Sequence, residues 1–271
     1  MKIRVKNVAP ARQGKLAVTA DLRSLLRRSG QTLVAPGASD ALSARLIEAH
    51  GYECVYIGSY ATAASRFGLP DTGRLSLEQL AAQAKTIVDA VRIPVIADAE
   101  GFDNAVPAFE AAGVGAIHIE DHTGAGKHTS APQKLHPMKE AAERIRQAVA
   151  ARKNPDFLIV ARSDAFWVHR DLEDCIARLE LYASAGADMV FPTMVGPGEL
   201  AEVRRRVARP LMIVDNPEEQ HEGAAIVLYY AFSITRQFAA LQQALATRKL
   251  ASDTAPLEDF LGYKDAPGRN R

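Results

Sequence analysis

A nearly regular alternation of short apolar runs and longer amphipathic stretches constrains the fold of this chain more than any other feature. Such an alternation predicts a parallel sheet whose strands are connected by helical crossovers. The apolar runs have strand length, and we expect eight strands at 32–35, 54–57, 93–98, 116–121, 157–162, 188–192, 210–214 and 224–228. The amphipathic stretches predict helices at 21–30, 39–50, 76–91, 105–112, 138–152, 172–185, 198–207 and 232–245.

The number of units favours a closed barrel over an open sheet. Eight strands within 271 residues suit an α/β fold made of a single (β/α)8 TIM barrel. A doubly wound open sheet would need a glycine-rich phosphate turn after an early strand, and residues 35–40 are a poor version of one. No internal linker marks a boundary, so we expect an N-terminal arm at 1–18 and one catalytic barrel with a C-terminal tail helix at 19–271.

Composition excludes several classes of protein. The 33 Lys and Arg residues against 32 Asp and Glu give a net charge of +1, so no basic field attracts nucleic acid. Cys54 and Cys175 lie in apolar patterns and predict packed thiols, not a disulfide framework or a zinc site. No apolar run reaches membrane-spanning length, and the N-terminus lacks the apolar stretch of a signal peptide. We therefore expect a cytoplasmic protein without nucleic-acid or membrane partners.

The third predicted strand ends in two acids, Asp98 and Glu100. Carboxylates at this point are not core filler, because an unpaired buried charge is costly. The two residues are two apart, so they point the same way as long as the chain stays extended. Two oxygen ligands on one side suit a Mg²⁺ ion that keeps several waters and takes further ligands from a substrate. A salt bridge or a helix cap is the alternative interpretation of this stretch.

The other strand ends also carry polar residues, and in a (β/α)8 barrel these ends meet at the active site. They are Ser59, Glu120 with Asp121, Arg162 with Asp164, Asp215 with Asn216, and Tyr229 with Tyr230. Acids from neighbouring strands repel each other unless a cation lies between them. Arg162 offers a planar fork for a substrate carboxylate. The rim thus predicts a divalent metal beside an anion clamp.

Other chemistries find less support. A Schiff-base lysine would stand at a strand end, but Lys127 and Lys134 fall in the loop after the fourth strand. A serine hydrolase would show Gly-x-Ser-x-Gly, which does not occur. His118 lies inside the fourth strand on the same side as Glu120, and either a place beside the metal or a satisfied core position suits it.

Six motifs together point to a family. They are Pro-Gly-Ala-Ser-Asp-Ala-Leu-Ser-Ala-Arg at 36–45, Gly-Leu-Pro-Asp at 68–71, Asp-Ala-Glu-Gly-Phe at 98–102, Ile-His-Ile-Glu-Asp at 117–121, Ala-Arg-Ser-Asp-Ala at 161–165 and Gly-Ala-Asp-Met-Val-Phe-Pro at 186–192. In this order and spacing they resemble the isocitrate lyase/phosphoenolpyruvate mutase superfamily, specifically its methylisocitrate lyase-like and dimethylmalate lyase-like branch. The resemblance runs from about residue 20 to the C-terminus.

This resemblance implies a Mg²⁺-dependent barrel enzyme, with Mn²⁺ as a possible substitute, that acts on small 2-oxo or 2-hydroxy di- and tricarboxylates. It implies Asp98 as the principal metal ligand, Glu100 and Glu120 as ligands directly or through water, and Asp71 as a further acid near the metal. The implied substrate-binding residues are Gly58, Ser59, Tyr60, Arg162 and Asn216. It also implies a homotetramer with a terminal helix swapped between barrels, to which residues 256–263 would belong.

Three departures from the family pattern bear on the chemistry. The metal motif Asp-Ala-Glu-Gly-Phe at 98–102 is one residue shorter than the family's Asp-Ala-Asp-x-Gly-Tyr-Gly. The loop after the fourth strand has Thr129 where the lyases have a proton-donating Cys, and a threonine hydroxyl titrates too high to replace a thiol. The sixth strand ends in Phe-Pro-Thr193, where the lyases have Phe-Pro-Glu.

We therefore expect an oxo-acid-lyase type of enzyme, a Mg²⁺-dependent carbon–carbon lyase that cleaves a small 2-hydroxy or 2-oxo di- or tricarboxylate through an enolate. The expected catalytic residues are Arg162, Glu120, Lys127, His128 and Thr129, with His128 as the candidate replacement acid. An oxaloacetate-type 2-oxo acid decarboxylase remains an alternative, as does a phosphonopyruvate hydrolase or phosphoenolpyruvate mutase-type C–P enzyme. A barrel that binds a metabolite without catalysis is the remaining hypothesis. The expected partners are a small carboxylate substrate and further copies of the chain.

Overall fold

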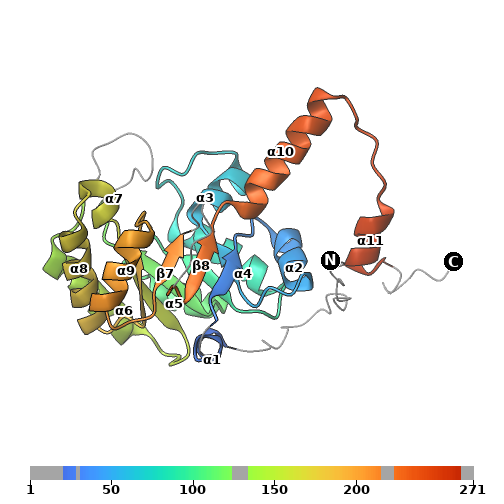
Figure 1. The fold of residues 1–271 in the computed structure, drawn as a ribbon. Coiled ribbons are helices and arrows are strands. Elements are labelled where there is room, and N and C mark those ends of the chain that lie inside the picture. Colours follow the sequence, from blue (N-terminus) through green and yellow to red (C-terminus); the bar gives the residue numbers. More distant parts are fainter. Residues whose placement is uncertain (1–20, 29–30, 124–133, 215–222, 264–271) are drawn as a thin grey trace.

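The computed structural model describes residues 21–28, 31–123, 134–214 and 223–263 (Figure 1). Its strands all pair in parallel and follow the predicted order. They are β1 (Leu33–Pro36), β2 (Val55–Ile57), β3 (Val95–Asp98), β4 (Ala116–Glu120), β5 (Leu158–Ser163), β6 (Met189–Pro192), β7 (Met212–Val214) and β8 (Ile226–Tyr229). Each lies within a few residues of its prediction, as expected for element boundaries.

The strands close into a ring. β2 to β6 form one sheet in sequence order, and β7, β8 and β1 form a second. Single parallel bridges between Gly37 and Tyr56 and between Val190 and Leu211 join the two sheets at both edges. Gly37 also permits the close approach of the chain after β1 to the end of β8, because a Cβ atom there would lie 2.3 Å from the carbonyl oxygen of Tyr230. The predicted (β/α)8 barrel is confirmed.

Helices surround the barrel, and most lie where the periodicity predicts them (Figure 1). They are α1 (Leu22–Leu26), α2 (Ala41–Ala49), α3 (Ser59–Thr62), α4 (Leu77–Val88), α5 (Ala105–Ala112), α6 (Met138–Ala151), α7 (Ala165–His169), α8 (Leu172–Ser184), α9 (Pro197–Arg206), α10 (Phe232–Ala246) and α11 (Ala255–Leu261), with a π-helical turn at Ala63–Phe67. None of the described helices is long and apolar enough to cross a membrane.

Two helical segments contradict the prediction. The stretch after Gly58, where the sequence predicted no helix, forms α3 and the π-helical turn, and α7 follows β5 directly. Neither helix has a capping hydrogen bond from a side chain at its start. Gly58 precedes α3 and has no side chain, and the carboxylate of Asp164 before α7 accepts from Arg162 instead. The two helices have four and five residues, too few to show a helical period.

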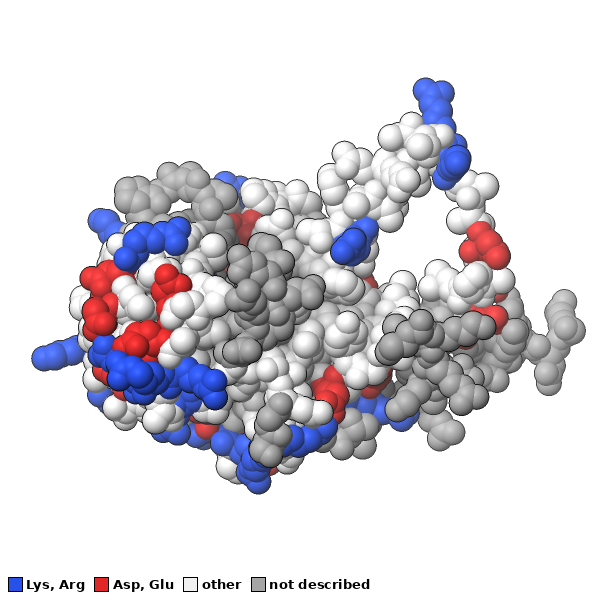
Figure 2. All heavy atoms as spheres, in the orientation of Figure 1, with Lys and Arg blue, Asp and Glu red and all other residues white. Residues whose placement is uncertain are grey.

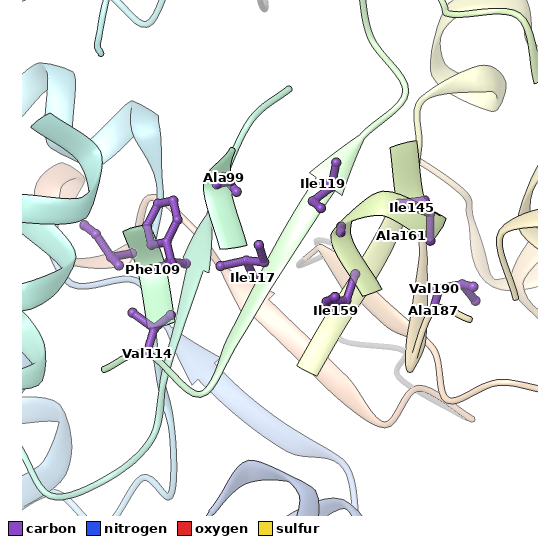
Figure 3. Close-up of a cluster of buried hydrophobic side chains, with 14 of the residues drawn as sticks. Ala99, Phe109, Val114, Ile117, Ile119, Ile145, Ile159, Ala161, Ala187 and Val190 are labelled. Atoms are coloured by element: carbon purple, nitrogen blue, oxygen red, sulfur yellow. The ribbon is translucent and has the colours of Figure 1, made fainter. Parts of the chain in front are cut away.

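Two apolar clusters fill the protein. One lies between the strands and the outer helices, where Phe109 of α5 and Ile145 of α6 face Ile117 and Ile159 (Figure 3). The other fills the barrel interior with alternate strand residues such as Ile96, Leu158 and Ile226. Leu22 and Leu25 of α1 belong to the interior cluster and close the amino end of the barrel. Cys54 and Cys175 are free, buried thiols, which confirms their prediction.

Candidate functional site

The interior face of the barrel changes character towards the carboxyl ends of its strands. Because side chains alternate along a strand, Ile96 and Asp98 share one side of β3, and Val160 and Arg162 share one side of β5. Ile96 and Val160 belong to the interior apolar cluster, so the polar residues one step further continue the same inward-facing series. The alternation that builds the core thus also directs the polar side chains into the mouth of the barrel.

A cavity of about 220 Å³ opens at this end. It is lined by Tyr56, Gly58, Ser59, Tyr60, Asp71, Asp98, Arg162, Trp167, Phe191, Thr193, Met194, Val214, Leu228 and Tyr230. The structure therefore brings together most of the described residues that the sequence suggested, from strands far apart along the chain. Clefts at the carboxyl ends of barrel strands are the usual place for active sites in this architecture.

Two of the predicted metal-site acids meet at one serine hydroxyl. Ser59 Oγ lies 2.9 Å from Asp71 Oδ2 and 3.1 Å from Asp98 Oδ2. A hydroxyl carries a single proton, so Ser59 donates to one carboxylate at a time. All three side chains are buried, which places two negative charges side by side in the cavity wall. Such a pair favours a bound cation.

Glu100 is placed by a turn and not by an extended strand. β3 ends at Asp98, and Glu100 has a φ of 49°, in the left-handed region. Our expectation that the two acids share a side because the chain stays extended is therefore wrong. The Glu100 amide donates to Asp98 Oδ1 over 2.8 Å, and the Glu120 amide donates to the Glu100 carbonyl over 3.2 Å. Arg144 of α6 holds the next residues, since it donates to the Gly101 carbonyl and to Asp103.

His118 was predicted either to lie beside the metal-site acids or to be a satisfied core residue, and it has features of both. It is fully buried, and its Nε2 lies 3.0 Å from the Tyr56 hydroxyl. Its Nδ1 lies 3.5 Å from Asp98 Oδ1, so the ring connects the barrel interior to the acid pair. Burial, and next the charge of Asp98, raise the pKa of Tyr56 well above its ordinary value. Tyr56 therefore stays protonated and presents a neutral hydroxyl to the cavity.

Arg162 lines the cavity as a fixed cation. Its Nε and Nη2 donate to the two carboxylate oxygens of Asp164 over 2.8 and 3.1 Å, and its Nη1 lies 3.5 Å from Glu120 Oε2. Burial acts to lower the pKa of Arg162, but the charges of Asp164 and Glu120 outweigh it and raise that pKa. The fork that we expected to face a substrate carboxylate is thus occupied by Asp164, and Nη1 is the part directed towards the acids.

The donor set fits an ion that needs few protein ligands. Among the described residues, no three His, Cys, Asp or Glu side chains gather closely enough to hold one metal together. Mg²⁺ is bound by one or two carboxylates while it keeps several waters, whereas structural Zn²⁺ takes four protein ligands. Asp98, with Asp71 beside it, supplies the hard oxygen atoms for the first arrangement and not for the second.

Several predicted residues fall outside the described part of the chain. These are Lys127, His128, Thr129, Asp215 and Asn216, together with the predicted arm at 1–18. Of the remaining substrate-binding candidates, Gly58 and Tyr60 line the cavity, and the Tyr60 ring meets the Tyr230 ring edge-on at 5.6 Å between centroids.

Sequence reasoning missed the apolar side of the cavity and Tyr56. Phe191, Met194, Val214 and Leu228 all line the cavity. At the end of a strand an apolar residue is indistinguishable from core, so attention to polar strand ends passed over them. The available signal was the alternation itself, because Val214 follows the interior residue Met212 by two, and Leu228 follows Ile226 by two.

Known proteins share both the sequence and the fold. The chain is 38% identical to the 2,3-dimethylmalate lyase of Eubacterium barkeri over 64% of this chain and 62% of that protein. It is 38% identical to the 2-methylisocitrate lyase of Salmonella typhimurium over 72% of this chain and 74% of that protein. The chain thus spans a little under two thirds of the first relative and about three quarters of the second.

Solved structures extend the likeness over nearly the whole fold. A crystal structure of 2,3-dimethylmalate lyase superposes with a TM-score of 0.81 at 27% identity, covering 90% of this chain and 91% of that one. Phosphonopyruvate hydrolase in complex with oxalate and Mg²⁺ superposes with a TM-score of 0.80 at 25% identity, covering 90% and 94%. Residues 22–248 match the phosphoenolpyruvate phosphomutase family, and the chain therefore belongs to that family.

Proposed function

We propose that this protein is a Mg²⁺-dependent carbon–carbon lyase that cleaves a small 2-hydroxy or 2-oxo di- or tricarboxylate. The observation that carries the proposal is the group formed by Asp71, Ser59 and Asp98 in one cavity with Arg162. Two relatives named as lyases, at 38% identity, support this type of reaction. The Mg²⁺ and oxalate of the phosphonopyruvate hydrolase complex support the metal and a small dicarboxylate ligand.

Each residue has a part in the proposed reaction. Asp98 would hold Mg²⁺, with Asp71, Glu100 and Glu120 contributing directly or through water. When bound, Mg²⁺ supplies a positive charge that stabilises the enolate oxygen. Ser59 and the neighbouring amides orient the 2-hydroxy acid end of the substrate. Arg162 is a permanently charged group on the cavity wall near the developing negative charge.

The proton donor is proposed from the loop after β4. His128 is the candidate, because Thr129 stands where the lyases have Cys and is too weak an acid at neutral pH. In His128→Ala we expect turnover to fall by about 100-fold or more with substrate affinity retained, the usual scale of general acid catalysis. Turnover unchanged from wild type would exclude His128 and leave Lys127 for the same test.

The activity is tested by a panel of substrates with and without EDTA. The panel contains 2,3-dimethylmalate, 2-methylisocitrate, isocitrate, oxaloacetate and phosphonopyruvate, and 2-oxo acid formation or loss is measured. EDTA-sensitive cleavage of a hydroxy di- or tricarboxylate supports the lyase. Turnover of oxaloacetate or phosphonopyruvate alone would replace the lyase by a decarboxylase or a C–P enzyme. No turnover of any compound with Mg²⁺ present would contradict the proposal.

We further propose that α10 and α11 are exchanged between barrels in a homotetramer. α10 leads away from the barrel, and Phe238, Leu241 and Leu245 on it are 64–65% exposed (Figure 1). Arg236 is the single charged residue of this helix, and mostly uncharged side chains cover it in Figure 2. An apolar surface of this kind normally packs against a partner. Leu241→Glu with Leu245→Glu should yield monomers in light scattering, whereas Gln242→Glu on the same helix should leave the assembly intact.

The proposed location is the cytoplasm. Two buried free thiols without a disulfide in the described structure suit a reducing compartment. Fractionation of cells that express the full chain tests this location, and recovery in a membrane or extracellular fraction would contradict it.

A further inference from the structure

We propose that the substrate is a malate derivative with a hydrocarbon arm at C3, longer than methyl, in place of the third carboxylate of a tricarboxylate. The inference rests on the proposed lyase function and specifies its substrate class. The inference follows from the apolar wall of the cavity, to which the proposed reaction assigns no role.

The wall opposite the acids is built from apolar side chains. β6 and β7 lie across the ring from β2 and β3, which carry Ser59 and Asp98. The side chains on that wall are Phe191, Met194, Val214 and Leu228, with Trp167 and Tyr230 at its borders. Phe191 and Leu228 are almost completely buried, whereas Met194 is 50% exposed at the mouth. A substrate whose head binds at Ser59 and Asp98 therefore directs its far end onto hydrocarbon.

The charges on the described lining residues provide for one distal carboxylate. Arg162 is the single Lys or Arg among the described lining residues. Two of its nitrogens donate to Asp164, so Nη1, which lies 3.5 Å from Glu120 Oε2, is the remaining nitrogen for the C4 carboxylate of a malate.

The Arg162 guanidinium lies over the Phe191 ring, 5.5 Å from its centroid, so the described part of the wall without a cation is the surface of Val214 and Leu228. A further carboxylate would be desolvated there, which is costly. Burying an alkyl arm there is favourable instead.

Thr193, at the border between the two walls, also favours an alkyl arm over a further carboxylate. It stands where the lyases that the chain resembles have an acid, and it is a neutral residue that accepts from Arg162 Nε over 3.0 Å. Because Thr193 is neutral, it adds no negative charge to the described apolar wall. The described wall therefore has no acid with which a second cation would pair. Among the described residues that line this wall, none carries a charge.

The cleavage of such a substrate balances without an oxidant or reductant. The C2 hydroxyl loses its proton, the C2–C3 bond breaks, and the electron pair remains on C3 as the enolate of the C4 carboxylate. A proton delivered to C3 then gives a carboxylate that bears the hydrocarbon arm, and C2 becomes the carbonyl of a 2-oxo acid.

The test compares 2-methylmalates that differ only at C3, with methyl, butyl or carboxymethyl as the substituent. We expect kcat/KM to increase from methyl to butyl, since each buried methylene contributes roughly fourfold. We expect the carboxymethyl compound to be at least tenfold poorer than the butyl compound. Trp167 is the only tryptophan of the chain, so its fluorescence measures binding of each compound separately from turnover.

The outcomes separate this inference from the proposed function. Turnover of the methyl compound with the carboxymethyl compound equal to or better than butyl would overturn the inference and leave the lyase intact. No turnover and no fluorescence change with any compound would overturn both.

Met194→Lys provides a test that a folding defect does not imitate. A cation on the apolar wall should lower kcat/KM for the butyl compound and raise it for the carboxymethyl compound, about tenfold each. Tyr52→Lys is the matched control, because Tyr52 has a similar exposure of 40% and precedes β2 at the other end of the barrel. The same substrate order in Met194→Lys as in wild type would overturn the inference.

Discussion

The two halves of the barrel mouth are built on the same backbone but differ in almost every other respect. The polar half, at the ends of β2 to β5, carries Asp71, Asp98, Glu120 and Arg162, all buried. The apolar half, at the ends of β6 to β8, carries Phe191, Val214 and Leu228. The polar half supplies electrostatics at the cost of desolvated charge, and the apolar half contributes burial and shape. In the proposed function, reaction type and substrate choice would thus depend on different strands.

This division has an energetic consequence. The four acids of the polar half, Asp71, Asp98, Glu100 and Glu120, stand near one arginine whose fork Asp164 occupies. Neighbouring carboxylates repel each other in a low dielectric, so a cation bound between them would stabilise this half. A ligand that binds only the folded state raises its stability in proportion to the logarithm of its concentration. Mg²⁺ should therefore stabilise the protein, and the polar half should be where it acts.

Removal of the Asp98 charge should have the largest effect. We expect Asp98→Asn to lower kcat/KM by about 10³-fold or more, because it removes the principal proposed metal ligand and the charge beside Ser59. The same variant should lose the increase in melting temperature that Mg²⁺ gives the wild type. Steady-state kinetics and thermal unfolding across a Mg²⁺ titration measure both.

The control for this variant is Asp156→Asn, an exposed acid just before β5 at the opposite end of the barrel. It should retain wild-type kinetics and the full response to Mg²⁺. If Asp98→Asn also kept that response, the cation would not bind in the polar half, and the proposed metal site would be wrong.

The next largest effect is expected from Arg162→Lys. Lysine keeps the positive charge but not the planar fork that pairs with both oxygens of Asp164. We expect about 100-fold lower kcat/KM, the scale of a misplaced catalytic group, together with a lower melting temperature. Activity within fivefold of wild type would show that a positive charge at this position is sufficient. The planar pairing of Arg162 with Asp164 would then not be required for activity.

Most of the fold and much of the polar half could be predicted from the sequence, for a physical reason. Strands buried on both faces are continuous apolar runs, and a charged residue directly after such a run stands out. Asp98, Glu120 and Arg162 were found in this way, and the structure places them at the carboxyl ends of neighbouring strands. The eight-strand order was equally accessible, because each strand is separated from the next by turn residues or a periodic helix.

The remainder depended on tertiary structure. The turn at Glu100 places this acid through a left-handed φ and a hydrogen bond to Asp98, neither of which a sequence pattern reveals. The sequence did not reveal that Arg162 pairs with Asp164. From the sequence alone, the guanidinium could equally face a neighbouring acid or a substrate in the cavity. The apolar half was invisible because Val214 and Leu228 look like core until the cavity beside them is known.

A smaller effect, on stability, should follow from shortening the apolar half. Leu228→Ala removes a buried side chain, and we expect a loss of about 2 kcal/mol in the free energy of unfolding. The loss lies at the low end for Leu to Ala because one side of Leu228 borders the cavity. Urea unfolding measures it, and the stabilisation by Mg²⁺ should stay unchanged. A loss of that stabilisation would show that the two halves are not independent.

The smallest effect is expected at Thr193, on the border between the two halves. Its Oγ accepts from Arg162 Nε over 3.0 Å, and a hydrogen bond from Thr193 helps to lower the pKa of Asp164. Burial acts to raise that pKa, but the charge and hydrogen bonds of Arg162, together with Thr193, bring it below the ordinary value. Thr193→Val removes one hydrogen-bonding group at nearly constant shape, so we expect a loss of about 1 kcal/mol at neutral pH.

The pH dependence of this variant decides whether the border residue acts through Asp164. An acid with a lowered folded-state pKa stabilises the protein above its unfolded pKa, and this contribution disappears as the pH falls through the folded-state value. Valine removes a hydrogen bond that lowers the pKa of Asp164, so the acid limb of the stability curve should move to higher pH. Urea unfolding of both proteins from pH 3 to pH 8 gives the two curves. Parallel curves would mean that Thr193 only fills space, and the polar half would then end at β5.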